Sequence, residues 1–411
     1  MRVLFITMPA VPHWFPMVPL AWGFRAAGHE VRVAGSPPIL GAIASTGLAA
    51  VPLTTGYDSR PRSRQSTGGG APAADGAAEV SADEKLRRFM TSQPDAMVNK
   101  LASQAEAMVT DLLPLIRDWR PDLVLADPIP FAAPLIAEMV GAPFVRMLWG
   151  PVMFLENPQT AAVLPPEVVA KLCARYGVTV RDDYAARTID PCPPRMSTGN
   201  VPNRIFMQYV PYNGPGELPP WLVAAGERPR VCLTWGTSTA RMLGDETFLL
   251  PQIVTGLAGL DVEVVVAANA ADRQRLGPVP ENVRVMESLP LNLLLPTCAA
   301  VVHTGGSGTT LTAAALGVPQ VAVVERFGEQ RFNAEKMAAA GAGIRVAPED
   351  ISATTVTAAT SAVLTDTSFR TAAAELSAEI RALPTPAEVV GALVEVATGG
   401  SGRAGRNRRV A

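Results

Sequence analysis

Hydrophobic positions along the chain fall into short β-branched runs that alternate with longer stretches of helical spacing. Short apolar runs predict buried strands, and apolar residues three and four positions apart predict helices. Such an alternation is typical of α/β domains with parallel sheets. In the first half, the pattern predicts strands at 3–7, 31–34, 123–126 and 144–148, and helices at 15–27 and before Gly141.

The pattern begins again after a proline-rich segment. Residues 208–229 contain five prolines, which neither a helix interior nor a central strand tolerates. Predicted strands then follow at 231–235, 262–267, 283–286, 300–303 and 321–324. We therefore expect two doubly wound, Rossmann-like parallel-sheet domains, 1–207 and 230–385, joined by a linker at 208–229. Open α/β sheets bind ligands at the carboxyl ends of their strands, so both domains should face a central cleft.

Two segments lack the bulky apolar residues that a core needs. Residues 58–82 are rich in Ser, Gly, Pro and Ala and predict a flexible loop. This loop is either a tolerated surface insertion or a lip over a substrate cleft. Residues 399–411 predict a disordered tail. For 386–398 we expect a C-terminal helix that packs back on the N-terminal domain.

Composition narrows the class of protein. Of 411 residues, 48% are hydrophobic and 18% charged, which excludes disorder of the whole chain. The net charge of −2 gives no general attraction to nucleic acid or to an anionic membrane.

The first apolar run ends at Pro9 and Pro12 and no run of about 20 apolar residues follows, so we expect a cytoplasmic protein without a membrane or nucleic-acid partner. The four cysteines and three histidines show no metal-ligand spacing, so no metal or cofactor is expected.

Residues 301–317, VVHTGGSGTTLTAAALG, carry the strongest chemical signal. An apolar strand runs into a glycine-rich turn and then into a helix, whose unpaired N–H groups favour an anion such as phosphate. The backbone, hydroxyl and imidazole groups that would hold the anion belong to His303, Gly305, Gly306, Ser307, Gly308, Thr309 and Thr310. A plain tight turn explains the same glycines, and the turn lacks the GK[ST] of a P-loop.

Polar residues near other predicted strand ends favour sugar or proton chemistry. Glu329, Gln330 and Asn333 suit the hydroxyls of a sugar, and a polar helix start explains them as well. His13 lies beyond the first strand and can take a proton from a hydroxyl, or it packs in its apolar loop. Asp127 follows another strand and either orients the His13 imidazole or caps the next helix.

Together these motifs resemble the GT-B nucleotide-sugar glycosyltransferases, in particular the actinomycete natural-product branch that attaches deoxysugars to macrolide and aromatic polyketide aglycones. In the second half the resemblance is carried by HTGGSGTT, GVPQ, GEQ and FNAEKMAAAGAG. Elsewhere it is carried by VPLAWGFRAAGHEVRVAGSP, MLWGP, DPCPP, VPYNGPG and LPLNLLL. The resemblance extends from Met1 to about residue 395, apart from 58–82. It implies an acceptor-binding domain at 1–207 and a nucleotide-sugar-binding domain at 230–385.

The resemblance also implies roles for single residues. The general base would be His13. The donor diphosphate would be held by Gly236, Thr237, His303, Gly306, Ser307, Gly308 and Thr309. Glu329 and Gln330 would contact the donor sugar, and Ser288 and Leu289 occupy the position of the nucleobase site without its usual tryptophan. The donor in this branch is a thymidine diphosphate deoxysugar.

We expect a single displacement at the anomeric carbon that inverts it, with fixed N–H dipoles in place of a metal ion. Trp14, Phe15 and Trp149 suit an apolar aglycone pocket, although Trp14 and Phe15 fit a core equally well. Three other functions stay open: an epimerase or hydrolase of the same fold, carbon-linked transfer to an aromatic ring, and a non-catalytic nucleotide-sugar binding protein. Some relatives require an activator protein, and a homodimer is also open.

Overall fold

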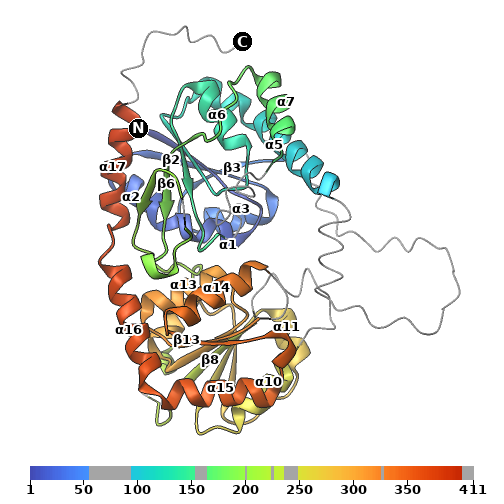
Figure 1. Ribbon diagram of the computed structural model, residues 1–411, viewed down its shortest axis with the longest axis vertical. Helices are drawn as coiled ribbons and strands as arrows, with labels where there is room; N and C mark the ends of the chain where they lie inside the picture. Colours follow the sequence, from blue (N-terminus) through green and yellow to red (C-terminus); the bar gives the residue numbers. More distant parts are fainter. Residues whose placement is uncertain are drawn as a thin grey trace, which may run out of the picture.

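The structure is a computed structural model that describes residues 1–54, 94–152, 164–199, 201–223, 226–235, 249–324 and 328–399. The predictions for 58–82, for Gly236 and Thr237, and for the tail beyond residue 399 lie outside these residues. The described chain forms two α/β domains stacked along the long axis of the molecule (Figure 1). Within this part of the chain, every helix is too short or too polar to cross a membrane.

The N-terminal domain contains a seven-stranded sheet in the order β3-β2-β1-β4-β5-β6-β7, and all its paired strands are parallel. The strands are β1 (Arg2–Ile6), β2 (Glu30–Gly35), β3 (Ala49–Pro52), β4 (Leu123–Ala126), β5 (Phe144–Met147), β6 (Ala185–Asp190) and β7 (Arg204–Phe206). The helices are α1 (Val11–Trp14), η1 (Phe15–Met17), α2 (Val18–Ala26), α3 (Pro37–Ala44), α5 (Pro94–Asp118), α6 (Ala132–Val140), α7 (Pro166–Tyr176) and η3 (Pro194–Met196). The strand order reverses between β1 and β4, which is where sheets of this kind bind ligands.

The C-terminal domain repeats this winding in a six-stranded parallel sheet of order β10-β9-β8-β11-β12-β13. The strands are β8 (Arg230–Thr234), β9 (Glu263–Ala268), β10 (Val283–Glu287), β11 (Ala300–His303), β12 (Gln320–Val323) and β13 (Gly343–Val346). The helices are α8 (Pro220–Val223, in the linker), α10 (Leu250–Ala258), α11 (Ala270–Leu276), α12 (Leu291–Leu294), η5 (Leu295–Thr297), α13 (Ser307–Leu316), α14 (Gly328–Ala339), η6 (Pro348–Asp350), α15 (Ala353–Thr365), α16 (Thr367–Arg381) and α17 (Pro386–Gly399). The prediction of two doubly wound parallel-sheet domains is confirmed.

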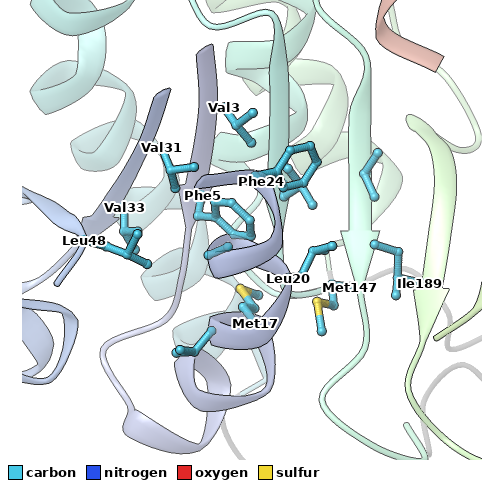
Figure 2. Packing of buried hydrophobic residues seen from close by; sticks show 14 of the residues in the cluster. Val3, Phe5, Met17, Leu20, Phe24, Val31, Val33, Leu48, Met147 and Ile189 are labelled. Carbon is cyan, nitrogen blue, oxygen red and sulfur yellow. The ribbon is translucent and has the colours of Figure 1, made fainter. Parts of the chain in front are cut away.

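Central strands are buried on both faces, which explains their continuous apolar runs. In β1, Val3 and Phe5 pack with Leu20 and Phe24 of α2 (Figure 2). The alternate residues Leu4 and Ile6 join the opposite core, beneath α5 and α6. Each fully buried side chain of this size contributes about 1.5–3 kcal/mol to folding. This double burial fixes the position of β1, and with it the position of the residues that follow it.

The last helix, α17, leaves the C-terminal domain and packs against α2 of the N-terminal domain (Figure 1). Val389, Val390 and Leu393 are buried in the same core as Phe24. Gly23 of α2 permits the close approach, because a Cβ there would lie 3.3 Å from Val390 Cγ2. The chain therefore crosses between the domains twice.

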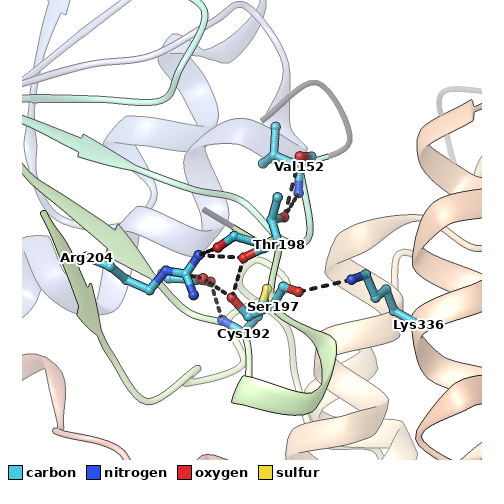
Figure 3. Close-up of polar contacts among 8 residues, drawn as sticks. Val152, Cys192, Ser197, Thr198, Arg204 and Lys336 are labelled. Carbon is cyan, nitrogen blue, oxygen red and sulfur yellow. Dashed lines mark hydrogen bonds and ion pairs between the residues drawn. The ribbon is translucent and has the colours of Figure 1, made fainter. Parts of the chain in front are cut away.

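A buried polar network holds the loop after β6 against the C-terminal domain (Figure 3). Asp190 accepts hydrogen bonds from Ser197 Oγ at 2.6 Å and from Cys192 N at 3.0 Å, and it faces Arg204 Nε at 3.5 Å. Lys336 of α14 donates to the Ser197 carbonyl at 3.2 Å. The DPCPP motif, which starts at Asp190, thus shapes a contact between the two domains.

Candidate active site

His13 and Asp127 come from the ends of two neighbouring strands. His13 lies on α1, directly after β1, and Asp127 follows β4, which pairs with β1. His13 Nδ1 lies 3.5 Å from Asp127 Oδ1, within ion-pair distance although longer than a good hydrogen bond. The side chain of Asp127 is fully buried, whereas that of His13 is 21% exposed. The far side of the imidazole can therefore meet a substrate.

Asp127 is fixed by the backbone around it. Its Oδ2 accepts from Met8 N at 3.1 Å, and its Oδ1 accepts from Ile129 N at 3.0 Å. The helix α6 begins only at Ala132 and has no side-chain cap, so the interpretation of Asp127 as a helix cap is wrong. The carboxylate instead faces one ring nitrogen of His13, as an orienting partner does.

Charge sets the protonation of His13. Burial lowers its pKa, but the nearby carboxylate of Asp127, with the charge of Glu329, raises it more. The pKa of His13 therefore lies above its usual value of 6.5. A neutral imidazole can accept a proton, and the nearby carboxylates stabilise the charged ring that results.

The glycine turn after β11 combines two kinds of glycine. Gly305 has a φ of +80°, and a Cβ there would lie 2.7 Å from the carbonyl oxygen of Gln330, so the fold itself requires glycine. At Gly306 and Gly308 a Cβ would meet no described atom within 4 Å. The helix α13 begins at Ser307 without a side-chain cap, so its first N–H groups have no partner within the helix. Open space beside these donors suits an anion such as phosphate.

His303 has a different role from the one that the sequence suggested. Its ring is buried, Nδ1 accepts from Gly305 N at 3.1 Å, and Nε2 pairs with Gln320 Oε1 at 3.0 Å. Gln320 in turn donates to the carbonyl of Thr310 at 3.2 Å. Burial lowers the pKa of His303 to about 4. The neutral ring holds the glycine turn in shape, and a hydrogen bond from it to phosphate would require one of these contacts to be exchanged.

The start of α14 places Glu329 beside the glycine turn. Ser307 Oγ donates to Glu329 Oε1 at 3.2 Å, and Trp149 of the N-terminal domain donates to the same oxygen. Asn333 is buried and donates to Ser307 Oγ at 2.8 Å and to the Gly305 carbonyl at 3.0 Å. Asn333 therefore supports the turn and is not placed as a sugar ligand, which corrects the sequence prediction.

The three predicted aromatic residues of the acceptor pocket occupy different environments. Trp149 lies against His13, with ring centroids 4.5 Å apart and planes at 54°. Trp14 is fully buried in the core of the N-terminal domain, so its prediction as an acceptor contact is wrong. Phe15 packs edge-on against Tyr212 of the linker at 4.9 Å. Of the three, Trp149 is the one that the fold brings to His13.

A pocket of about 170 Å³ lies at the carboxyl ends of β8, β9 and β10. Its lining consists of Thr234, Ala267, Ala268, Asn269, Asp272, Ser288, Leu289 and Leu291. Ser288 and Leu289, which the sequence proposed for the nucleobase, thus form part of one wall. Ser288 has a φ of 56°, and its N–H donates to the Ala268 carbonyl at 3.2 Å. An unfavourable backbone conformation kept at a pocket wall is frequently linked to ligand binding.

Two family models match most of the chain. The C-terminal domain of Erythromycin biosynthesis protein CIII-like proteins matches residues 251–396, and their N-terminal domain matches residues 22–236. The chain belongs to this EryCIII-like family.

Individual relatives of this EryCIII-like protein agree with that assignment. Tylactone mycaminosyltransferase of Streptomyces fradiae is 35% identical, over 95% of this chain and 91% of the relative. The 10-deoxymethynolide desosaminyltransferase of Streptomyces venezuelae is 36% identical, over 97% of each chain. The structure of Spinosyn Rhamnosyltransferase SpnG complexed with thymidine diphosphate superposes with a TM-score of 0.80 at 30% identity, over 96% of this chain and 100% of the other. The resemblance to natural-product deoxysugar transferases of the GT-B fold is confirmed, and the chain is a glycosyltransferase.

Sequence reasoning missed two polar residues of the pocket in this EryCIII-like glycosyltransferase. Asn269 Oδ1 accepts from Asp272 N at 2.9 Å, and Asn269 Nδ2 donates to Asp272 Oδ2 at 2.6 Å. Burial raises the pKa of Asp272, against the hydrogen bond of Asn269 and the charge of Arg275. An Asn-x-x-Asp pair directly after an apolar strand is the signal of a capped helix start, and it would have placed both residues at the strand end.

Proposed function

We propose that this EryCIII-like glycosyltransferase moves a deoxysugar from a thymidine diphosphate donor to a hydroxyl of a polyketide-type acceptor and inverts the anomeric carbon. One observation carries the proposal: His13 and the glycine turn, from different domains, are joined by a single series of contacts. Trp149 lies against His13 and donates to Glu329, and Glu329 accepts from Ser307 at the start of α13. These contacts support a proton acceptor and an anion site that face one another at the domain junction.

The chemistry is one in-line displacement. The acceptor oxygen forms a bond to the anomeric carbon, and its proton passes to Nε2 of His13, because Nδ1 faces Asp127. The bond between the anomeric carbon and the diphosphate oxygen breaks, and its electron pair leaves with the diphosphate. The N–H groups at the start of α13, that of Ser307 among them, and the hydroxyl of Thr309 stabilise that growing charge. A single displacement of this kind inverts the carbon.

A retaining route would need a carboxylate nucleophile at the anomeric carbon. Glu329 already accepts from Trp149 and Ser307, which suits an acceptor of hydrogen bonds from sugar hydroxyls better than a nucleophile. A nucleobase site at Ser288 and Leu289 is supported by the pocket there, and thymidine as the base is supported by the similarity to a structure that holds thymidine diphosphate. The roles of Gln330, Gly236 and Thr237, an activator protein, a homodimer, metal independence and a cytoplasmic location stay predictions.

The test is a product analysis with the purified full chain. The protein is incubated with thymidine or uridine diphosphate deoxysugars and with a panel of macrolactone and aromatic polyketide aglycones, with and without EDTA. We expect an oxygen-linked glycoside of opposite anomeric configuration, formed best from the thymidine donor and unaffected by EDTA. Mass spectrometry identifies the product, and proton coupling constants give its configuration.

Other outcomes separate the alternatives. Free sugar or an epimer formed without aglycone would replace the proposal by a hydrolase or epimerase. A carbon-linked product would change the acceptor chemistry. Donor binding without turnover, even beside the activator protein of a relative, would indicate a binding protein.

A further inference from the structure

Trp149 contacts one predicted functional residue in each domain. Its ring lies against the His13 imidazole of the N-terminal domain, with centroids 4.5 Å apart. Its indole N–H donates to Glu329 Oε1 of the C-terminal domain. Trp149 is only 7% exposed, so neither contact is an accident of a mobile surface side chain.

The backbone around Trp149 fixes this geometry. Leu148 and Val152 on either side are buried in one small apolar cluster with Trp149. Gly150 approaches the start of α13 so closely that a Cβ on it would lie 2.7 Å from Ser307 Cβ. The N-terminal domain thus holds the segment, and glycine at position 150 lets the start of α13 dock against it.

Glu329 has hydrogen-bonding capacity beyond these contacts. An ionised carboxylate offers about four lone-pair sites. Trp149 and Ser307 both donate to the same oxygen, Oε1. A sugar hydroxyl can therefore donate to Glu329 without displacing the indole. The carboxylate would be held in one orientation before the sugar arrives, which reduces the entropic cost of binding it.

We propose that Trp149 is a positioning residue that holds Glu329 for the donor sugar through its N–H and supports the His13 ring through its aromatic face. The proposal rests on the proposed function, because it takes Glu329 as the sugar ligand and His13 as the base. The two contacts of one side chain then align the sugar and the base in a single docked state of the domains.

The two roles can be separated by substitution. Trp149→Phe keeps an aromatic ring beside His13 and removes the N–H, whereas Trp149→Leu removes both. Trp22→Phe is the matched control, since Trp22 also donates its indole N–H, to the Thr46 carbonyl at 3.0 Å, and lies on α2. Each variant is titrated calorimetrically with thymidine diphosphate and with a thymidine diphosphate deoxysugar, and its kcat is measured.

For Trp149→Phe we expect the Kd of the nucleotide sugar to rise about tenfold, because the Glu329 carboxylate must then be ordered when the sugar binds. The Kd of thymidine diphosphate and kcat should change less than about twofold to threefold. For Trp149→Leu we expect the same loss of sugar affinity and, in addition, a fall in kcat of about tenfold or more. Trp22→Phe should match the wild type in all three quantities.

A readout independent of turnover accompanies these measurements. The chain contains only three histidines, so the ring resonances of His13 can be followed by NMR in histidine-labelled protein. The chemical shifts of His13 should move on adding the nucleotide sugar to the wild type, and this response should shrink in Trp149→Leu.

Two results would overturn the positioning role. One is a nucleotide-sugar Kd in Trp149→Phe within about twofold of the wild type. The other is an equal loss of thymidine diphosphate affinity, which would indicate general damage to the junction. Failure of the proposed function looks different: wild-type protein would then bind thymidine diphosphate sugars no better than other nucleotides, or form no glycoside.

Discussion

His13 and His303 lie in opposite electrostatic surroundings, and their pKa values shift in opposite directions. His13, partly exposed, faces the carboxylates of Asp127 and Glu329, and its pKa lies above the usual value. His303 is buried between the neutral amides of Gln320 and Gly305, and its pKa falls to about 4. Burial opposes a charged imidazole in both places, and only a nearby negative charge overcomes it. His13 is therefore suited to proton transfer, and His303 to holding a loop.

The largest effect that the comparison predicts is at His13. His13→Ala removes the proton acceptor, so we expect kcat to fall about 10²–10⁴-fold while the affinity for thymidine diphosphate is retained. Steady-state kinetics and calorimetry measure the two quantities. The control is His29→Ala, since His29 lies in the turn before β2 and contacts the N-terminus. Equal turnover of His13→Ala and wild type would remove His13 as the base.

The next largest effect concerns Asp127, the carboxylate that His13 has beside it and His303 lacks. Asp127→Asn removes the largest cause that raises the pKa of His13, so this pKa should fall. The base must be neutral to act, and activity therefore rises with pH through the pKa of His13. The acidic limb of the kcat profile should move to lower pH, and kcat at the optimum should fall about 10–10²-fold as the ring loses its orienting partner. A limb that stays in place would show that Asp127 does not set the charge of His13.

The smallest effect is on stability, and it has opposite signs at the two histidines. The folded pKa of His303 lies below its usual value of 6.5, so the folded state loses stability as the pH falls from 6.5 toward 4. His303→Gln can keep both neutral hydrogen bonds and cannot titrate. When the pH is lowered from 7 to 5.5, the free energy of unfolding of His303→Gln, measured in urea, should fall by about 1 kcal/mol less than that of the wild type.

His13→Gln is the matched variant for that measurement. The folded pKa of His13 is raised, so its contribution to stability is complete below 6.5 and is lost as the pH rises through the folded value. His13→Gln should therefore lose more stability than the wild type on acidification, the reverse of His303→Gln. Parallel unfolding curves for all three proteins would contradict the assigned protonation states.

Most of the fold could be predicted from local pattern. The predicted strands at 123–126 and 300–303 match β4 and β11 to the residue. The strands that the pattern missed are β3, β6, β7 and β13, which lie at or next to sheet edges and carry short or arginine-containing sequences. A strand at or next to a sheet edge is less buried than a central strand, so it needs no continuous apolar run. Its sequence therefore predicts a strand only weakly.

The predicted helix at 15–27 also shows where prediction from the pattern of apolar residues fails. The structure divides this region, together with the residues just before it, into α1, η1 and α2. Each of the three has a proline at its first or second position. Proline fits a helix start but interrupts a helix interior. The spacing of apolar residues did not predict these breaks in the helix. The breaks determine where His13 lies relative to β1.

What the sequence determined was local: strand and helix periods, the glycine turn at 305–308, and polar residues at strand ends. These follow from backbone geometry and from the burial of nearby side chains. Tertiary structure decided which polar groups meet. The order of strands brings Asp127 to His13, and docking of the domains brings Trp149 to Glu329, 180 positions away. It also separated Trp14, which the core encloses, from Trp149, which reaches the junction. Contacts between distant residues depend on packing of the whole chain, and no local period encodes them.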